Sequence, residues 1–358
     1  MDLKAFKDPK LAKGLIASIE AWAPENAVLM EVCGTHTVAI ARNGIRALMP
    51  EGIRLASGPG CPVCVTSNHD IDKVIALARI PDVIITTFGD MTRVPGSTSS
   101  LLAEQAAGRD VRIVYSPLDA LRLAQEYPDR QVVFVGVGFE TTTPLVAMAV
   151  KRAKDAGLKN FSVYGAHKNM PGALEAIIND PELKVDALIL PGHVSTIIGI
   201  EPYRFLAEKY GIPGVITGFE PNDVLQGIAM LMRQLHEGRA EIEIAYARGV
   251  MEQGNPVAMA AIDEVFETCT ATWRGLGDIP GSGYRIREEY AEFDAMRRFA
   301  PEIEPTIEHK GCRCGDVLRG IMAPSECPLF RKVCTPENPV GPCMVSGEGS
   351  CAAYFRFY

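Results

Sequence analysis

A pair of cysteines two residues apart is the part of this sequence best suited to thiol chemistry. Cys61 and Cys64 form a Cys-x-x-Cys motif, which follows a Gly-Pro-Gly turn at residues 58–60. This spacing is typical of redox-active dithiols, because a helix N-terminus often stabilises the first thiolate. Polar residues 66–68 predict such a helix, running to Arg79. Half of a zinc site and a pair of inert thiols remain alternatives, although zinc would need a second pair.

A third thiol, Cys33, precedes His36 in the motif of residues 33–37. A thiolate with a nearby imidazole could be an activated nucleophile. It could equally be an iron ligand that His36 helps to orient. A buried structural thiol beside a capping threonine is the remaining alternative.

Six further cysteines lie close to the C-terminus: Cys312, Cys314, Cys327, Cys334, Cys343 and Cys351. The last four are separated by six, eight and seven residues, whereas zinc ligands usually come in close pairs. Iron–sulfur clusters accept looser spacing when four thiolates converge, so the spacing favours a [4Fe–4S] cluster over zinc. The spacing assigns no role to Cys312 and Cys314. Cys269 stands alone and is interpreted as a plain buried thiol.

Glu140 is the candidate carboxylate, within a Gly-Phe-Glu-Thr-Thr-Thr-Pro motif at residues 138–144. Its threonines could cap a helix whose N-terminus holds a small anion. The motif lacks the third glycine of a dinucleotide fingerprint, and no phosphate-binding P-loop occurs, so a nucleotide site is weakly supported. His167 and His193 follow other apolar runs and are each interpreted first as structural histidines.

The composition excludes several classes of protein. Of the 358 residues, 47% are hydrophobic and 22% charged, as in an ordinary globular protein. A net charge of −8 argues against binding to nucleic acid or to an anionic membrane surface. No apolar run is long enough to span a membrane or resembles a signal peptide, so we expect a cytoplasmic protein. Ten cysteines in a reducing compartment favour metal or redox roles over structural disulfides.

Apolar runs that alternate with helical stretches predict parallel α/β structure. Eight such runs are found, at residues 28–32, 53–56, 83–87, 111–115, 132–137, 161–164, 187–190 and 215–217. We interpret them as two similar four-stranded domains, at 28–130 and 131–248, which face a shared cleft. The motifs follow the runs directly, where open parallel sheets bind their ligands.

Flanking segments complete the predicted domain organisation. Helices are expected at 3–22, 222–237 and 250–267, with Asn222 and Asp223 as candidate caps of the second. Residues 1–27 form an N-terminal helical segment, and 249–358 form a helical and Cys-rich iron–sulfur domain. A Gly-rich loop at 275–283 would act as a hinge within the latter.

Five long motifs, at residues 33–37, 58–66, 138–144, 191–195 and 327–354, resemble those of the hydrogenase maturation protein family HypD. The resemblance covers nearly the whole chain in the same order. It implies a scaffold on which the Fe(CN)2CO group of [NiFe] hydrogenases is assembled, rather than a conventional enzyme. It also implies two similar α/β domains and a cluster domain.

Residue roles and partners follow from the same resemblance. Cys33 would bind the transient Fe(CN)2CO iron with His36 beside it, and Cys61 and Cys64 would be redox-active. The ligands of the [4Fe–4S] cluster would be Cys327, Cys334, Cys343 and Cys351. HypC would hold the iron together with this chain and carry it to the hydrogenase large subunit, while HypE would deliver cyanide as a thiocyanate. An iron–sulfur-dependent thiol–disulfide reductase and a zinc-stabilised binding module are the alternatives.

Overall fold

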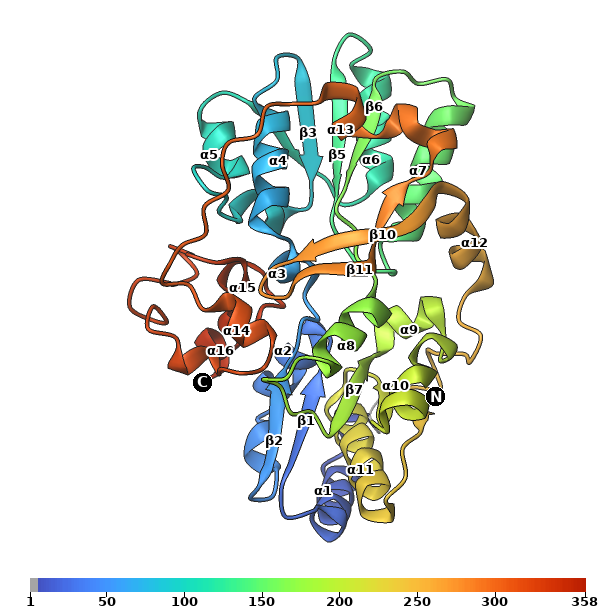
Figure 1. Ribbon diagram of the computed structural model, residues 1–358, viewed down its shortest axis with the longest axis vertical. Coiled ribbons are helices and arrows are strands. Elements are labelled where there is room, and N and C mark those ends of the chain that lie inside the picture. The colour runs from blue at the N-terminus through green and yellow to red at the C-terminus, as the bar shows by residue number, and fades with distance from the viewer. Residues whose placement is uncertain (1–5) are drawn as a thin grey trace.

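Two parallel β-sheets, each flanked by helices, form the body of the protein in a computed structural model that describes residues 6–358 (Figure 1). The larger sheet has the order β2 (Ile53–Ser57), β1 (Ala27–Glu31), β7 (Ala187–Pro191), β8 (Gly214–Thr217) and β9 (Ile242–Ile244). The smaller has the order β4 (Asp110–Ile113), β3 (Val83–Thr87), β5 (Gln131–Gly136) and β6 (Phe161–Gly165). Every pairing within these two sheets is parallel, which confirms the predicted fold class.

The distribution of the strands between the two sheets differs from the prediction. The chain places β1 and β2 in the larger sheet, builds the whole smaller sheet from β3 to β6, and then returns with β7, β8 and β9. The predicted boundary at residue 130 is therefore wrong for the sheets, because it separates β3 and β4 from β5 and β6 of the same sheet. Each apolar run is equally suited to either sheet, and long-range pairing decides between them. The Cys61–Cys64 segment lies where the chain first crosses from one sheet to the other.

Helices cover the sheets, whose central strands are buried on both faces, as expected for parallel sheets. The helices before the hairpin described below are α1 (Pro9–Trp22), α2 (Gly34–Arg42), α3 (Pro62–Val65), α4 (Asn68–Ala78), α5 (Leu101–Ala106), α6 (Pro117–Glu126), α7 (Thr143–Asp155), α8 (Met170–Ile178), α9 (Gly192–Ile198), α10 (Arg204–Tyr210), α11 (Pro221–Glu237) and α12 (Pro256–Val265). Among residues 6–358, no helix is long and apolar enough to cross a membrane.

The predicted helix ends are partly confirmed. Ser67, one of the polar residues predicted to cap the helix after the dithiol, caps α4 by accepting from the Asp70 N–H. In α11 the N-cap is Glu220, and the predicted cap Asp223 instead accepts from the Glu220 N–H at 3.1 Å. The predicted N-terminal helix is observed from Pro9 onward, while Leu3 lies outside the described residues.

An antiparallel hairpin lies between the two sheets, where the sequence predicted a helix end and a hinge loop (Figure 1). Its strands are β10 (Phe266–Trp273) and β11 (Gly277–Ile286), so the helix predicted to residue 267 ends at Val265. Gly283 permits the close pairing, because a Cβ there would lie 2.6 Å from the Cβ of Ala271. Gly283 of the predicted loop therefore serves a tight strand pairing rather than a hinge.

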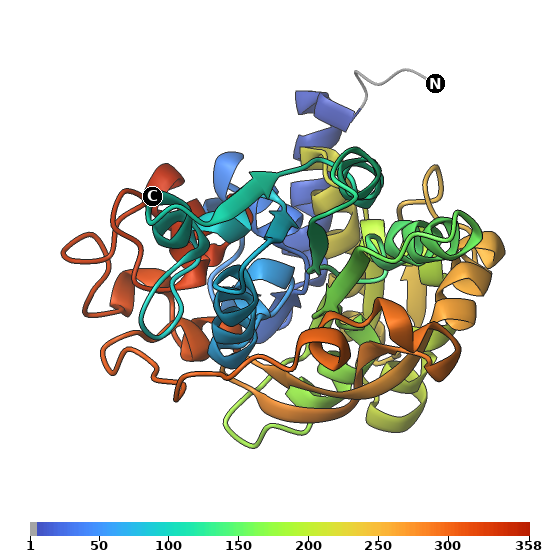
Figure 2. The ribbon, with the colours of Figure 1, turned by 90° about the horizontal axis from the view of Figure 1, so that it is seen from above.

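The Cys-rich C-terminal segment packs on one side of the molecule, as Figures 1 and 2 show. Its short helices are α14 (Cys314–Leu318), α15 (Pro342–Val345) and α16 (Ser350–Phe357), whereas the preceding α13 (Ala295–Phe299) packs against β6. Helices α14 and α15 contact α3, and α16 contacts α2. The segment therefore packs on both loops that carry the upstream cysteines.

Candidate functional site

Adjacent strands β1 and β2 position the three upstream cysteines. Cys33 is the N-cap of α2 and lies two residues after β1 ends at Glu31. Cys61 is the N-cap of α3, and Cys64 lies within this helix. Because β1 and β2 pair in parallel, both loops leave the sheet at the same edge. The structure thus brings the cysteines of two separate motifs to one place.

Two glycines allow these loops to touch. A Cβ at Gly60 would lie 2.2 Å from the backbone nitrogen of Cys33, and one at Gly34 would lie 3.3 Å from the Cβ of Cys61. The Gly34 N–H also donates a hydrogen bond to the Gly60 carbonyl, at 3.0 Å. No side chain can stand between the two loops, so the cysteine-bearing backbones are in direct contact.

A buried ion pair holds the same strand ends together. The carboxylate of Glu31 accepts hydrogen bonds from the Ser57 hydroxyl at 2.7 Å and from the Arg46 guanidinium at 3.0 Å. Burial raises the pKa of Glu31, and the charge of Arg46 partly offsets this. Glu31 ends β1 and Ser57 ends β2. The hydrogen bond between their side chains, together with the ion pair to Arg46, therefore fixes the two loops relative to each other.

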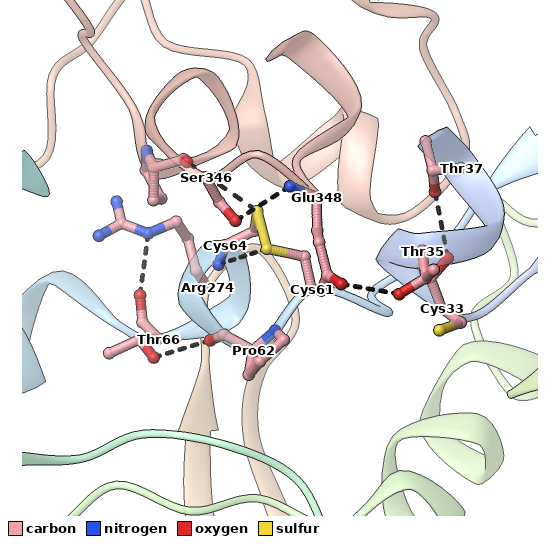
Figure 3. Close-up of a disulfide and its surroundings, with 11 residues drawn as sticks. Cys33, Thr35, Thr37, Cys61, Pro62, Cys64, Thr66, Arg274, Ser346 and Glu348 are labelled. Atoms are coloured by element: carbon pink, nitrogen blue, oxygen red, sulfur yellow. Dashed lines mark hydrogen bonds between the residues drawn. A yellow bond between two sulfur atoms is a disulfide. The ribbon is translucent and has the colours of Figure 1, made fainter. Parts of the chain in front are cut away.

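Cys61 and Cys64 form a disulfide with their Cα atoms 5.2 Å apart (Figure 3). The Cys64 N–H donates to the Cys61 sulfur at 3.2 Å. The pair is closed off from solvent, because Cys61 is 3% exposed and Cys64 is fully buried. The Cys64 sulfur lies 3.9 Å from the carbonyl oxygen of Pro342, so the C-terminal segment covers it.

Cys33 is held as a neutral thiol. Its side chain is 8% exposed, and the backbone N–H groups of His36 and Thr35 point at its sulfur. Burial, together with the negative charge of Glu348, raises the pKa of Cys33 to about 11. At neutral pH the sulfur of Cys33 therefore carries a proton and is not the thiolate of an activated nucleophile. A ligand that binds this sulfur must displace the proton.

Glu348 brings the C-terminal segment to the Cys33 loop. Its carboxylate accepts a hydrogen bond from the Thr35 hydroxyl at 2.7 Å, which lies between the disulfide and Cys33 in Figure 3. A Cβ at Gly34 would lie 2.6 Å from the Cβ of Glu348, so the two backbones are also close. Nothing in the sequence pattern linked Glu348 to Cys33, because the two residues lie in motifs far apart along the chain.

The imidazole of His36 does not pair with the Cys33 thiol. Its Nε2 lies 2.7 Å from the Thr217 hydroxyl and 2.9 Å from the Gly218 carbonyl, at the end of β8. Burial lowers the pKa of His36 to about 4, so the ring is neutral. The interpretation of His36 as the base of a nucleophilic pair is therefore wrong: the ring ties α2 to the β8 loop, and only the backbone N–H serves Cys33.

An aromatic stack extends from His36 to the protein surface. The ring of Phe219 lies between His36 and His193, with ring centroids 4.7 Å and 3.9 Å away. His193 follows β7 and is exposed, whereas His36 is buried. His193 therefore borders the Cys33 region rather than filling a core, contrary to its first interpretation as a structural histidine.

Glu140 lies at the end of β5 in the other sheet. One carboxylate oxygen accepts a hydrogen bond from the Met170 N–H at 2.9 Å, and the other has no partner among the described residues. Burial raises the pKa of Glu140 to about 7. The predicted threonine cap is not observed, since the hydroxyl of the N-cap Thr142 makes no capping bond.

Tyr203 lies within electrostatic reach of both Glu140 and Cys33. It is fully buried, and its hydroxyl lies 3.3 Å from the Ser195 hydroxyl. Burial raises the pKa of Tyr203, and the charge of ionised Glu140 adds to the effect. A buried phenol therefore interacts electrostatically with the carboxyl that follows β5 and with the thiol that follows β1.

All six C-terminal cysteines line one small cavity of about 20 Å³, closed by apolar side chains. Cys314 contacts Cys312 and Cys343, and their hydrogen bonds lower its pKa. Cys343 also contacts Cys351, and Cys334 lies near Cys351 and Cys327. The two cysteines without a predicted role thus join the four predicted cluster ligands.

The fit of this cavity to a metal group depends on its donors. Among residues 6–358, no three His, Cys, Asp or Glu side chains already surround a point that suits a single metal ion. The cavity nevertheless brings together six thiols and an apolar wall that includes Leu329, Phe330 and Met344, with Arg313 as its one charged lining residue. Such a donor set suits an iron–sulfur cluster, which needs four thiolates and little water.

Comparison with known proteins agrees with the motifs. Residues 10–358 match the HypD family, described as "Hydrogenase formation hypA family". Over 98% of its length the chain is 50% identical to the hydrogenase maturation factor HypD of Rhodobacter capsulatus, covering 97% of that protein. It is 50% identical to HypD of Azotobacter vinelandii (98% and 95% covered) and 46% identical to HypD of Cupriavidus necator (99% and 96%). The chain therefore belongs to the HypD family.

Proposed function

We propose that this chain is a hydrogenase maturation factor that serves as a scaffold for building the Fe(CN)2CO group of [NiFe] hydrogenases. One observation carries the proposal: the loop of Cys33 and the loop of the Cys61–Cys64 disulfide touch at the edge of one sheet. A metal-binding thiol and a two-electron redox pair are thereby held side by side. The names of the relatives as hydrogenase maturation factors support the same role.

The iron fragment is the substrate of this assembly, and Cys33 is its ligand on this chain. Low-spin iron with cyanide and carbon monoxide ligands is soft and prefers thiolate. The backbone N–H groups of Thr35 and His36 face the sulfur and would stabilise the thiolate once iron displaces the proton. HypC would supply the remaining protein ligands, so that the iron is held between the two proteins.

The Cys61–Cys64 pair would supply the electrons for cyanide transfer. HypE would present cyanide as a thiocyanate on its C-terminal cysteine. Reducing the carbon–sulfur bond takes two electrons and one proton, which give a free thiol on HypE and cyanide for the iron. Oxidation of the dithiol to the disulfide releases two electrons and two protons, so one proton passes to solvent. The disulfide seen here corresponds to the state after this step.

The cavity lined by the six C-terminal cysteines would hold a [4Fe–4S] cluster, with Cys327, Cys334, Cys343 and Cys351 as the proposed ligands. When bound, such a cluster supplies single electrons. The chain's own contribution is to pack α14 and α15 against α3, and so to place the cavity beside the disulfide. HypC would then carry the finished group to the hydrogenase large subunit.

Infrared spectroscopy of the protein purified with HypC tests the redox role. We expect Cys61→Ala and Cys64→Ala each to abolish the Fe–CN bands, because neither variant can form the disulfide. Cys269→Ala is the matched control, since Cys269 lies in β10 and lines a different cavity, and it should keep the bands. Normal bands in either of the first two variants would refute the redox role.

A free-standing thiol–disulfide reductase is the second candidate, and the structure disfavours it. A reductase that acts on other proteins needs an accessible sulfur, whereas Cys61 is 3% exposed and Cys64 is covered by the C-terminal segment. Cys33→Ala separates the two functions. It should abolish hydrogenase maturation if Cys33 binds iron, and should leave the reductase intact.

A further inference from the structure

A polar cavity of about 230 Å³ lies where β6 and the following loop meet the β10–β11 hairpin, apart from the cysteine site. Helix α4 supplies Asp70 and Lys73 to its wall, and residues 164–168 supply the floor beside the end of β6. The carboxyl end of a parallel strand is a common place for ligands. The proposed maturation chemistry uses none of these side chains.

Lys168 is a buried cation in this wall. It is 3% exposed, and its ammonium donates to the Thr272 carbonyl at 3.0 Å. The nearest carboxylate oxygen, on Asp70, is 3.9 Å away, which is too long for a hydrogen bond. The ammonium also lies 5.7 Å from the centroid of the Trp273 ring, a cation–π contact. An ammonium has three N–H donors, so Lys168 still has donor capacity that these contacts leave unused. Burying a charge in this way is costly unless a partner compensates it.

His167 lines the same cavity and is 1% exposed. Neither of its ring nitrogens has a hydrogen-bond partner among the described residues. The ring is held in place, because it lies against Gly136, where a Cβ would come within 2.4 Å of its Cε1. Burial lowers the pKa of His167 to about 3, so the ring is neutral and offers one N–H donor and one acceptor.

The carboxylate of Asp70 already has hydrogen-bond partners and forms part of the cavity wall. It accepts hydrogen bonds from the hydroxyls of Tyr164 and Ser67, each at 2.7 Å. The Asp70 carboxylate therefore needs no hydrogen bond from a ligand. The cavity lining also includes Lys73, Arg285 and Asp294, so three cations face two carboxylates and a ligand with one negative charge balances them.

We propose that this cavity binds a small carboxylate, which accepts hydrogen bonds from Lys168 and His167. A carboxylate has two acceptor oxygens for these two donors and carries one negative charge. Ala166, Ala271 and Met296 give the cavity an apolar wall that suits a short carbon chain. The volume is smaller than the 300–1,000 Å³ or so typical of drug-sized ligand pockets, which argues against a nucleotide.

Titration of the full-length protein with sodium acetate tests the proposal, with inorganic phosphate as the competing oxyanion. Histidine ring nitrogens, labelled with ¹⁵N, report the contact directly in the unmodified protein. We expect acetate to shift one histidine in a saturable manner, and that signal to be missing in His167→Gln. No saturable shift with acetate would overturn the proposal, and so would tighter binding of phosphate than of acetate.

A matched pair of variants tests the cation. Lys168→Met should weaken acetate binding about tenfold or more, because it removes a charge-assisted hydrogen bond. Lys209→Met removes an equal charge from an exposed position on α10 and should leave binding unchanged. Equal binding by parent and Lys168→Met, or equal losses in both variants, would overturn the proposal. Should Lys168→Met fail to fold, the ring shift in the unmodified protein decides alone.

Discussion

The buried carboxyl of Glu140 predicts a pH dependence of stability that one substitution, Glu140→Gln, can test. The side chain is buried, and only one of its oxygens has a hydrogen-bond partner among the described residues. Burial therefore favours the neutral acid and raises the pKa of Glu140 to about 7 from an ordinary value of 4.5. Glutamine keeps the carbonyl that accepts from the Met170 N–H but has no charge to lose or gain.

The size of the effect follows from the two pKa values. A change from 4.5 to about 7 corresponds to about 3 kcal/mol of folding free energy. The unfolded chain loses this proton near pH 4.5, whereas the folded chain keeps it until about pH 7. The stabilisation from the neutral acid is thus fully present below pH 4.5 and is lost as the pH rises through 7. Relative to the parent, Glu140→Gln should gain about 3 kcal/mol between these limits.

Chemical denaturation of parent and variant at several pH values between about 4.5 and 8 measures this gain. Glu104→Gln is the control with the opposite sign. Burial would raise the pKa of Glu104, but its ion pair with Arg79 at 2.9 Å lowers it overall, so this variant should lose stability at neutral pH. A stability difference between Glu140→Gln and the parent that stays constant across the pH range would refute the reasoning.

Two further predictions concern the contact between the cysteine loops. Gly60→Ala should destabilise the protein by about 1–3 kcal/mol and separate Cys33 from the disulfide, because the new Cβ would overlap the Cys33 backbone. Gly347→Ala is its control, with no atom within 4 Å of the new Cβ, and thermal unfolding compares the two; equal melting temperatures would contradict the contact. Arg46→Met should cost about 3–5 kcal/mol, because it leaves the buried Glu31 carboxylate unpaired. Adding Glu31→Gln should recover part of that loss in denaturant unfolding, and no recovery in the double variant would show that the ion pair is not the cause.

Eight of the nine strands in the two parallel sheets were predictable from the sequence, but their partners were not, and β9 was missed. Each run of apolar residues followed by a Gly-rich or polar turn became a parallel strand, because periodicity and turn residues are local properties. Sheet membership depends instead on which strands meet after the chain has crossed between sheets, as β2 and β3 show. The hairpin was missed because glycines at 275–283 were interpreted as a loop, although alternating residues 266–273 carried a strand signal.

The meeting of Cys33 with Cys61 and Cys64 was predictable for a physical reason. Both motifs follow strands directly, and neighbouring parallel strands end at one edge of their sheet. Glu348 and Tyr203 were not predictable, since their approach to Cys33 depends on packing between distant segments. His36 shows that closeness in sequence can also mislead. It lies three residues after Cys33, but its ring points to the β8 loop, where it hydrogen-bonds with a hydroxyl and a carbonyl.

Some contacts between distant segments can be inferred from glycines within the cysteine motifs. Gly60 lies against the Cys33 backbone, and Gly34 lies against both Cys61 and Glu348. Gly341 has the Cys312 sulfur 2.7 Å from the position that its Cβ would take. These three glycines have no positive φ angle that would require glycine for backbone reasons. Their role is to leave space, because the site is built where separate segments touch. A glycine beside a functional cysteine therefore indicates that another part of the chain approaches there, even though it cannot indicate which part.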